Sequence, residues 1–193
     1  MDHDNGRPEA QDGLPELKVR RWSNYPRPGI DFPDVSTFTC NGPLASIAFR
    51  ELERCLPDDV DLIAGIDVGG IGFAGALALV RGIGFFDIRK VGSLRPDVVR
   101  YVMPNYELGS GVALSKGNPL AERSVAVIDD CLMSGKTALA SIQLLRRLGA
   151  RCTTALFVIE LEGLGGRAVL EAEGIAVRAL RLLPSTRPSP SPI

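Results

Sequence analysis

Histidine is almost absent from this chain of 193 residues, in which His3 is the single example. A Ser-His-Asp triad or a histidine-rich metal site is therefore not expected, because both depend on histidine held inside a fold. Cysteine is also scarce, and the four that occur are widely spaced with no CxxC pair. This spacing favours free thiols in a reducing compartment over a disulfide framework.

Long apolar runs are missing as well. No stretch approaches the roughly 18 apolar residues that a membrane-spanning helix requires. The first residues, MDHDNGRPEAQDG, are polar and acidic, unlike a secretory signal. Net charge is −1, from 22 basic and 23 acidic residues, so no strongly basic surface for nucleic acid is expected. We expect a cytoplasmic protein that binds neither membrane nor nucleic acid.

The length predicts a single domain large enough to bury its own core. Residues 1–13 and the Pro/Ser-rich residues 184–193 have the composition of disordered segments, which leaves a domain at 14–183. Within it, Leu14–Trp22 has the spacing of a short helix. Strand-like apolar runs then alternate with helical patterns, at 61–67, 84–88, 112–115, 124–128, 153–159 and 175–182 for the strands and 43–55, 71–81 and 138–148 for the helices. This alternation predicts an α/β fold with a mainly parallel central sheet flanked by helices.

The most informative stretch is Ser124–Thr137, SVAVIDDCLMSGKT. An apolar strand leads to Asp129 and Asp130, and a loop of small residues at Met133–Thr137 precedes a helix. Backbone N–H groups of such a loop and the helix dipole form an anion site, while carboxylates accept hydrogen bonds from sugar hydroxyls. The stretch therefore predicts a sugar-phosphate site. It does not fit a Walker loop, since the position that needs glycine holds Asp130.

Two further strand ends carry polar chemistry. Val68-Gly69-Gly70 follows the strand at 61–67, and it fits either a phosphate cradle or tight packing in a strand-to-helix turn. Arg89-Lys90 ends the strand at 84–88. Because ligands bind at the carboxyl ends of parallel strands, we expect these groups to converge with Asp129 and Asp130 on one substrate. The long connection at 92–114 is expected to form a lid or hairpin.

Three motifs in this order resemble the type I phosphoribosyltransferases, and within them the branch that acts on adenine. VIDDCLMSGKT resembles the family's motif for phosphoribosyl pyrophosphate (PRPP), NYPRPGIDFPDVS resembles the N-terminal DFPxPGIxFRDIS signature, and IELEGLGGRAVLEAEGI resembles the C-terminal element. The resemblance implies transfer of the 5-phosphoribosyl group of PRPP to a purine, with adenine giving AMP, and release of pyrophosphate. It also implies a homodimer, a flexible lid and Mg²⁺ bound mainly through the pyrophosphate, with no direct metal ligands from the protein.

The resemblance assigns roles to individual residues. Asp129 and Asp130 would hold the ribose hydroxyls, and Glu107 of the lid would help to move a proton on the base. The 5′-phosphate would be bound by Met133, Ser134, Gly135, Lys136 and Thr137, the pyrophosphate by Val68, Gly69, Gly70 and Lys90, and the base by Asp31, Phe32 and Leu161.

Four positions depart from the family pattern. Pro33 and Gly69 stand where arginines are usual, Leu108 replaces a tyrosine, and Asp31 replaces an apolar residue beside the base. Other cations are candidates to compensate: Lys136, Arg89, Arg95 and Arg100. Asp31 fits either a local turn hydrogen bond or a contact to a base with an extra donor. Two alternatives to adenine transfer therefore remain open, a phosphoribosyltransferase for a different base and a regulator that senses PRPP or nucleotides.

Overall fold

The computed structural model describes residues 18–90, 97–102 and 111–185. Seven of the strands in these residues form one sheet in the order β5-β6-β4-β3-β7-β8-β9. The five strands from β4 to β9 in this order are parallel, and β5 and β6 add antiparallel pairs at one edge. The prediction of a mainly parallel sheet is confirmed. The strands are β3 (Leu62–Ile66), β4 (Gly84–Lys90), β5 (Val98–Val102), β6 (Gly111–Ser115), β7 (Ser124–Leu132), β8 (Arg151–Glu162) and β9 (Ala176–Pro184).

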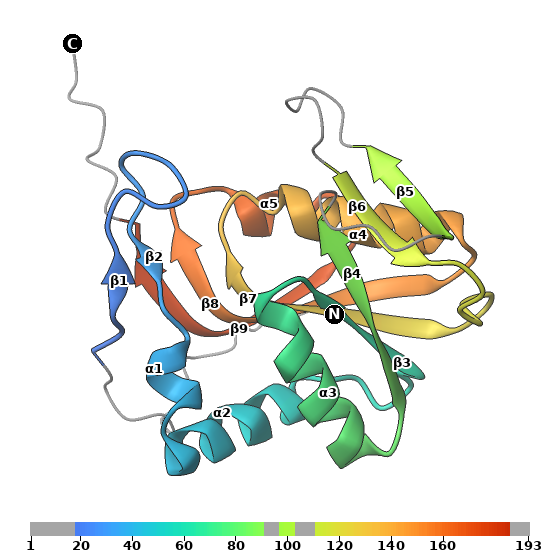
Figure 1. Cartoon of the computed structure of the whole chain (residues 1–193), viewed down its shortest axis with the longest axis horizontal. Coiled ribbons are helices and arrows are strands. Elements are labelled where there is room, and N and C mark those ends of the chain that lie inside the picture. Colours follow the sequence, from blue (N-terminus) through green and yellow to red (C-terminus); the bar gives the residue numbers. More distant parts are fainter. Residues whose placement is uncertain (1–17, 91–96, 103–110, 186–193) are drawn as a thin grey trace, which may run out of the picture.

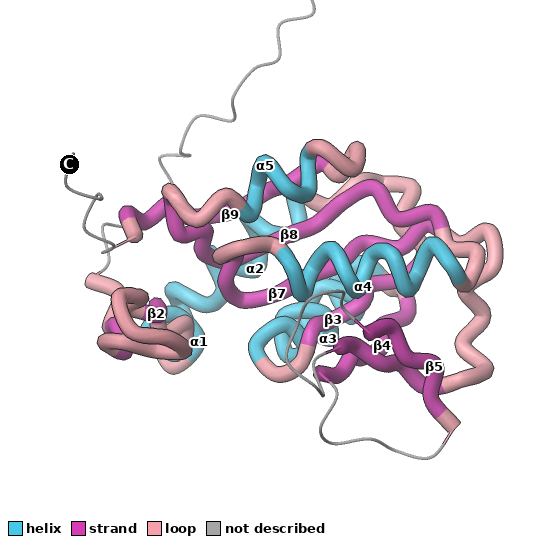
Figure 2. The backbone as a smooth tube through the Cα atoms, turned by 90° about the horizontal axis from the view of Figure 1, so that it is seen from above, coloured by secondary structure: helices cyan, strands magenta, loops and turns pink. Residues whose placement is uncertain are grey.

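Helices cover both faces of the sheet (Figures 1 and 2). Alternate residues of β7 divide between the faces: Val125 and Val127 pack in the core under α4 and α5, while Ala126 and Ile128 pack in the core with α2 and α3. A strand buried on both sides needs apolar residues at every position, as this one has. The helices are α1 (Ser36–Thr39), α2 (Gly42–Arg54), α3 (Gly69–Arg81), α4 (Lys136–Arg147) and α5 (Gly166–Glu171). None of the helices described here is long and apolar enough to cross a bilayer.

Several element boundaries differ from those predicted. The α3 helix begins at Gly69, two residues before the predicted start, and α4 likewise begins at Lys136. The β7 strand continues through Asp129 and Asp130 to Leu132, because its backbone stays paired with β8 up to Glu160. The acidic pair therefore belongs to the end of the strand itself.

The N-terminal part of the described chain forms a small lobe beside the carboxyl ends of β8 and β9 (Figure 1). Here β1 (Arg21–Trp22) pairs antiparallel with β2 (Phe32–Pro33). The helix predicted at Leu14–Trp22 is thus wrong over its described residues, since 18–20 are irregular and 21–22 are strand. Pairing with a partner about ten residues away decided this backbone, and a single-sequence helical pattern does not register such pairing.

The predicted hairpin at the sheet edge is confirmed for its two strands, β5 and β6. Tyr101 of β5 is buried, and its hydroxyl donates a hydrogen bond to Gln143 of α4. The guanidinium of Arg147 lies over the same ring at 4.5 Å. Tyr101 therefore fastens the hairpin to α4. The tip of the predicted lid, with Glu107 and Leu108, lies outside the described residues.

Candidate functional site

One pocket gathers most of the predicted site residues at the carboxyl ends of the central strands. Nine of them line it: Phe32, Lys90, Asp129, Asp130, Met133, Ser134, Gly135, Lys136 and Thr137. Four more lining residues were not predicted: Cys131, Leu132, Ala138 and Phe157. Phe157 lies opposite Asp129 in the pairing of β7 with β8. Nothing in the sequence separates it from the apolar core residues around it.

The Met133–Thr137 segment joins β7 to α4 and wraps the start of the helix. Gly135 has a φ of +71°, a conformation that glycine adopts without the strain other residues meet. Its carbonyl accepts the first hydrogen bond of α4, from Leu139 at 2.8 Å. The first N–H groups of α4 have no partner within the helix, so the segment offers donors and a positive dipole end to an anion.

The neighbouring acids Asp129 and Asp130 both line this pocket. The backbone N–H of Asp130 donates to Asp129 Oδ1 at 2.9 Å. Burial, and then the neighbouring carboxylate, raise the pKa of Asp129 well above its ordinary value, and burial raises the pKa of Asp130. Two acids forced together in this way are stabilised by hydroxyl donors or by a cation.

Lys90 is the cation that faces the acidic pair. Its charge lowers the pKa of both aspartates, partly opposing the effect of burial. The neighbouring Arg89 is engaged elsewhere, because its Nε donates to Asp87 Oδ2 at 2.5 Å. Of the two adjacent cations, only Lys90 lines the pocket, and among the cations proposed to compensate for missing arginines Lys136 lines it too. Arg100 is exposed on β5, and Arg95 lies outside the described residues.

Val68, Gly69 and Gly70 lie next to the acidic pair without lining the pocket. The Asp67–Val68 peptide bond is cis, and Gly69 and Gly70 form the first turn of α3. A Cβ on Gly69 would lie 2.3 Å from Cγ of Asp130, and one on Gly70 would lie 2.2 Å from the carbonyl oxygen of Ile128. The glycines thus allow α3 to start directly against β7.

The predicted base-binding residues separate in the structure. Phe32 lines the pocket, with the Tyr25 ring edge-on to it at 5.6 Å between centroids. Leu161 is buried in the apolar cluster that Phe32 packs against. Asp31 accepts a hydrogen bond from the backbone N–H of Asn24 at 3.3 Å, which is the local turn contact. Neither Asp31 nor Leu161 lines the pocket.

Arg21 is a cation near the site that the sequence did not single out. It lies directly opposite Pro33 in the β1–β2 pairing, so the two side chains share one face. Its Nη1 donates to the carbonyl of Pro184 at 3.0 Å, and its charge lowers the pKa of the pocket residue Cys131 against the larger effect of burial. Arg21 therefore brings positive charge close to the position where Pro33 has none. The antiparallel pairing of two short segments was the missing signal.

Comparison with known proteins gives a consistent result. A family model described as phosphoribosyl transferase domain matches residues 43–165. The chain is 39% identical over 178 residues to an adenine phosphoribosyltransferase of Mesorhizobium japonicum, across 90% of this chain and 96% of that protein. It is 38% identical over 160 residues to an adenine phosphoribosyltransferase of Mycolicibacterium vanbaalenii, across 79% and 88%.

Solved structures with the same fold include further proteins of this name. The adenine phosphoribosyltransferase of Rhodothermus marinus superposes with a TM-score of 0.78 at 28% identity, over 86% of this chain and 94% of that one. That of Thermoanaerobacter pseudethanolicus gives a TM-score of 0.76 at 28% identity, over 86% and 95%.

Proposed function

Because the chain belongs to the phosphoribosyltransferase family, we propose that it transfers the 5-phosphoribosyl group of PRPP to adenine, forming AMP and pyrophosphate in purine salvage. The observation that carries the proposal is that a phosphate-type loop, an acidic pair, a cation and an aromatic ring line one and the same pocket. These are the four groups that a phosphate, a ribose, a pyrophosphate and a planar base require. The loop follows the acidic pair directly along the chain, as the 5′-phosphate adjoins the ribose in PRPP.

In this proposal, Asp129 and Asp130 accept hydrogen bonds from the ribose hydroxyls, and the Met133–Thr137 segment binds the 5′-phosphate through backbone N–H groups and the hydroxyls of Ser134 and Thr137. Displacing pyrophosphate from C1′ makes the sugar positively charged in the transition state. In this proposal the two carboxylates stabilise that charge. Holding both reactants in line supplies much of the remaining acceleration.

Lys90 and the Val68–Gly70 turn are proposed to contact the pyrophosphate. Lys90 supplies charge, and the turn supplies backbone N–H groups at the start of α3. Phe32 stacks on the base and Leu161 supports that face from behind, while Glu107 assists proton movement on the base. Asp31 is proposed to shape the turn through its bond to Asn24, which leaves no requirement for an unusual base.

The residues present also fit Mg²⁺. Mg²⁺ keeps several waters and is held by substrate phosphates with one or two carboxylates. Within 18–90, 97–102 and 111–185, no three acidic, histidine or cysteine side chains form a cage for a metal, while Asp129 and Asp130 offer a carboxylate pair at the pocket. The ion would neutralise and orient the leaving pyrophosphate when it is bound with PRPP.

We also propose that two copies pair through the outer face of α3. Val68 and Leu79 are 79% and 84% exposed, and Phe85 is 51% exposed, with its ring 3.3 Å from where a Cβ on Gly75 of α3 would lie. Such an exposed apolar stripe is typical of an interface. In light scattering after gel filtration, Leu79→Glu should convert a dimer to a monomer. The matched control Val169→Glu, at an exposed apolar residue of α5, should not.

The free state of all four cysteines supports a place in the cytoplasm.

The enzymatic proposal is tested by incubating the protein with PRPP, Mg²⁺ and a panel of adenine, hypoxanthine and guanine, and measuring pyrophosphate and nucleotide. AMP formation with adenine, slowed about 10- to 100-fold in Asp129→Asn, is the expected result. Turnover restricted to another base would reject adenine as acceptor. No pyrophosphate release with any base would reject the reaction.

A further inference from the structure

We propose that the ion pair between Glu160 of β8 and Arg167 of α5 positions the phosphate-binding segment and so sets the affinity for the substrate's 5′-phosphate. The inference rests on the proposed function, because it concerns the phosphate end of the same site. Neither side chain lines the pocket, so both are positioning residues. They act through Gly166, the first residue of α5.

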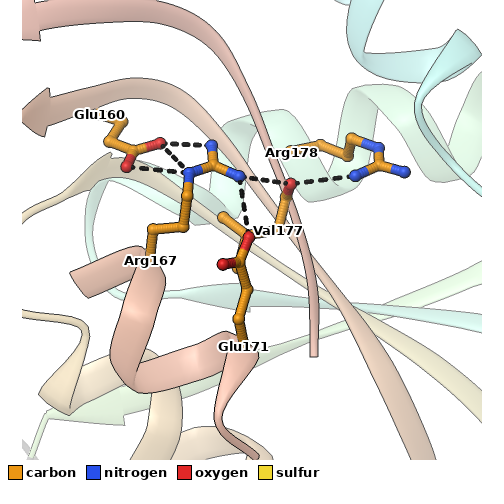
Figure 3. A network of polar contacts seen from close by, with 5 residues as sticks. All are labelled: Glu160, Arg167, Glu171, Val177 and Arg178. Carbon is orange, nitrogen blue, oxygen red and sulfur yellow. Dashed lines mark hydrogen bonds and ion pairs between the residues drawn. The ribbon is translucent and has the colours of Figure 1, made fainter. Parts of the chain in front are cut away.

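The pair is the centre of a network of polar contacts that includes Glu171 and Val177 (Figure 3). Arg167 Nε donates to both carboxylate oxygens of Glu160 at 3.1 Å, and Nη2 donates to Oε2 at 2.5 Å. Nη1 donates to the carbonyl of Val177 in β9 at 3.1 Å and to Glu171 at 3.3 Å. Glu160 is only 8% exposed, so its charge depends on this partner. One guanidinium therefore ties α5 to two strands of the sheet.

The residue before Arg167 touches the phosphate-binding segment, backbone against backbone. A Cβ on Gly166 would lie 2.2 Å from the carbonyl oxygen of Met133 and 2.9 Å from the N of Gly135. A Cβ on Gly135 would in turn lie 2.8 Å from the carbonyl oxygen of Gly166. No side chain fits between the two segments. A displacement of Gly166 must therefore move or release the loop that carries the phosphate donors.

The other end of the loop is connected to the same ion pair. Glu160 lies opposite Leu132 in the pairing of β7 with β8, and Leu132 is the residue before Met133. The loop is thus held at its strand end by Leu132, which pairs with Glu160, and on its outer side by Gly166, which precedes Arg167. The pair closes this frame across the gap between β8 and α5.

Buried ion pairs are not needed for stability as such, because apolar residues of similar volume often replace them without loss of stability. The guanidinium fork differs from an apolar contact because it fixes distance and direction together. Hydrogen bonds from backbone N–H groups to a phosphate weaken steeply when donor and acceptor are misaligned. A fixed direction is therefore what the phosphate-binding loop requires from its support.

The test compares Glu160→Gln and Arg167→Lys with the matched control Glu171→Gln. This control removes another carboxylate that pairs with the Arg167 guanidinium but leaves the contact between α5 and β8 intact. Calorimetry measures the Kd of ribose 5-phosphate, adenosine and AMP for each variant and for the wild type. Glu160→Gln should raise the Kd of ribose 5-phosphate and of AMP about tenfold, because it removes a charge-assisted hydrogen bond that supports the loop. The Kd of adenosine should not change. Arg167→Lys should fall between, and Glu171→Gln should match the wild type.

Unchanged binding of ribose 5-phosphate by a folded Glu160→Gln would overturn the inference. An equal loss for adenosine and AMP would also overturn it, because that result indicates general loosening of the fold. If Glu160→Gln does not fold, Arg167→Lys decides by the same two criteria. These measurements need no turnover, so an absence of AMP formation by the wild type would reject the proposed reaction while this test still gives its own answer.

Discussion

The carboxylate of Asp130 occupies the space that any side chain at position 69 would need. A Cβ on Gly69 would lie 2.3 Å from both Cγ and Oδ2 of that carboxylate. The family's usual arginine at this position is therefore incompatible with this placement of Asp130, and the glycine and the position of the acid go together. A side chain at 69 is accommodated only by moving one of the proposed ribose ligands.

Replacement of this glycine gives the first prediction. Gly69→Ala should destabilise the fold by about 1–3 kcal/mol through overpacking, and should raise the KM for PRPP more than that for adenine. Gly72→Ala is the matched control, since the same helix has open space there and alanine is the better helix former. Thermal unfolding and initial rates check both. Equal behaviour of the two variants would contradict the proposed contact.

Because Asp129 and Asp130 lie so close together, we expect one substitution of this pair to increase stability and reduce activity. Burial and the neighbouring Asp130 raise the pKa of the Asp129 carboxyl, so its charged form is unfavourable in the fold. Asp129→Asn removes this charge and should stabilise the free protein by about 0.5–2 kcal/mol. The same change removes a charged hydrogen-bond acceptor for ribose, which should lower kcat/KM about 10- to 100-fold. A melting temperature below that of the wild type would contradict this account.

The gain should also depend on pH. The folded pKa of Asp129 lies above its ordinary value of 3.8, so the folded state keeps the proton to higher pH than the unfolded chain does. The stability that comes from protonated Asp129 is therefore fully present below its ordinary pKa. It is lost as the pH rises through the raised pKa of the folded state. The advantage of Asp129→Asn over the wild type should therefore grow from about pH 4 towards neutrality. Melting curves of both proteins across this range measure the difference.

Much of this architecture followed from local patterns, and the exceptions among the strands share one cause. The strand through Val125–Ile128 and the loop after it were predicted because apolar runs, acids and small residues follow one another directly. The extension of β7 to Leu132 depends on pairing with β8, and the strand at Arg21–Trp22 depends on pairing with Phe32–Pro33. Such contacts join distant segments, and one sequence does not reveal their register.

The candidate site divides in the same way. Asp129, Asp130 and the loop after them are contiguous, so their grouping needed no tertiary information. Phe157 and Arg21 reach the site region only through strand pairing, and Leu161 is buried in an apolar cluster and does not line the pocket. The network of Glu160 and Arg167 was likewise not predicted, because the bond spans a turn between β8 and α5.

Cysteine reactivity provides a prediction independent of activity. Burial raises the pKa of Cys152 to about 12, and burial with the two nearby aspartates raises that of Cys131 further, so both thiols stay protonated at neutral pH. Cys40 is exposed. A thiol reagent at about pH 8 should modify Cys40 quickly and reach Cys131 and Cys152 only after unfolding, because the thiolate is the reactive form. Mass spectrometry of the labelled peptides checks this, and early labelling of Cys131 would contradict it.

The one tryptophan of the chain is placed to report on the base. Trp22 lies directly opposite Phe32 in the β1–β2 pairing, shares its face, and is 53% exposed. Adenine stacked on Phe32 should therefore change the tryptophan fluorescence, whereas inorganic phosphate, bound at the Met133–Thr137 loop, should not. Phe32→Ala should remove the fluorescence change caused by adenine. It should also weaken adenine binding by about 1–3 kcal/mol, the usual contribution of one stacked base.

The matched control is Val169→Ala, which shortens an exposed apolar side chain of α5 and changes neither the β1–β2 lobe nor a residue that lines the pocket. Its adenine titration should follow that of the wild type. If Phe32→Ala binds adenine as the wild type does, the ring is no platform for the base, and the acceptor must lie elsewhere in the pocket. A fluorescence change with phosphate alone would instead mean that the β1–β2 lobe moves when the loop at Met133–Thr137 is filled, since Trp22 belongs to the lobe and does not line the pocket.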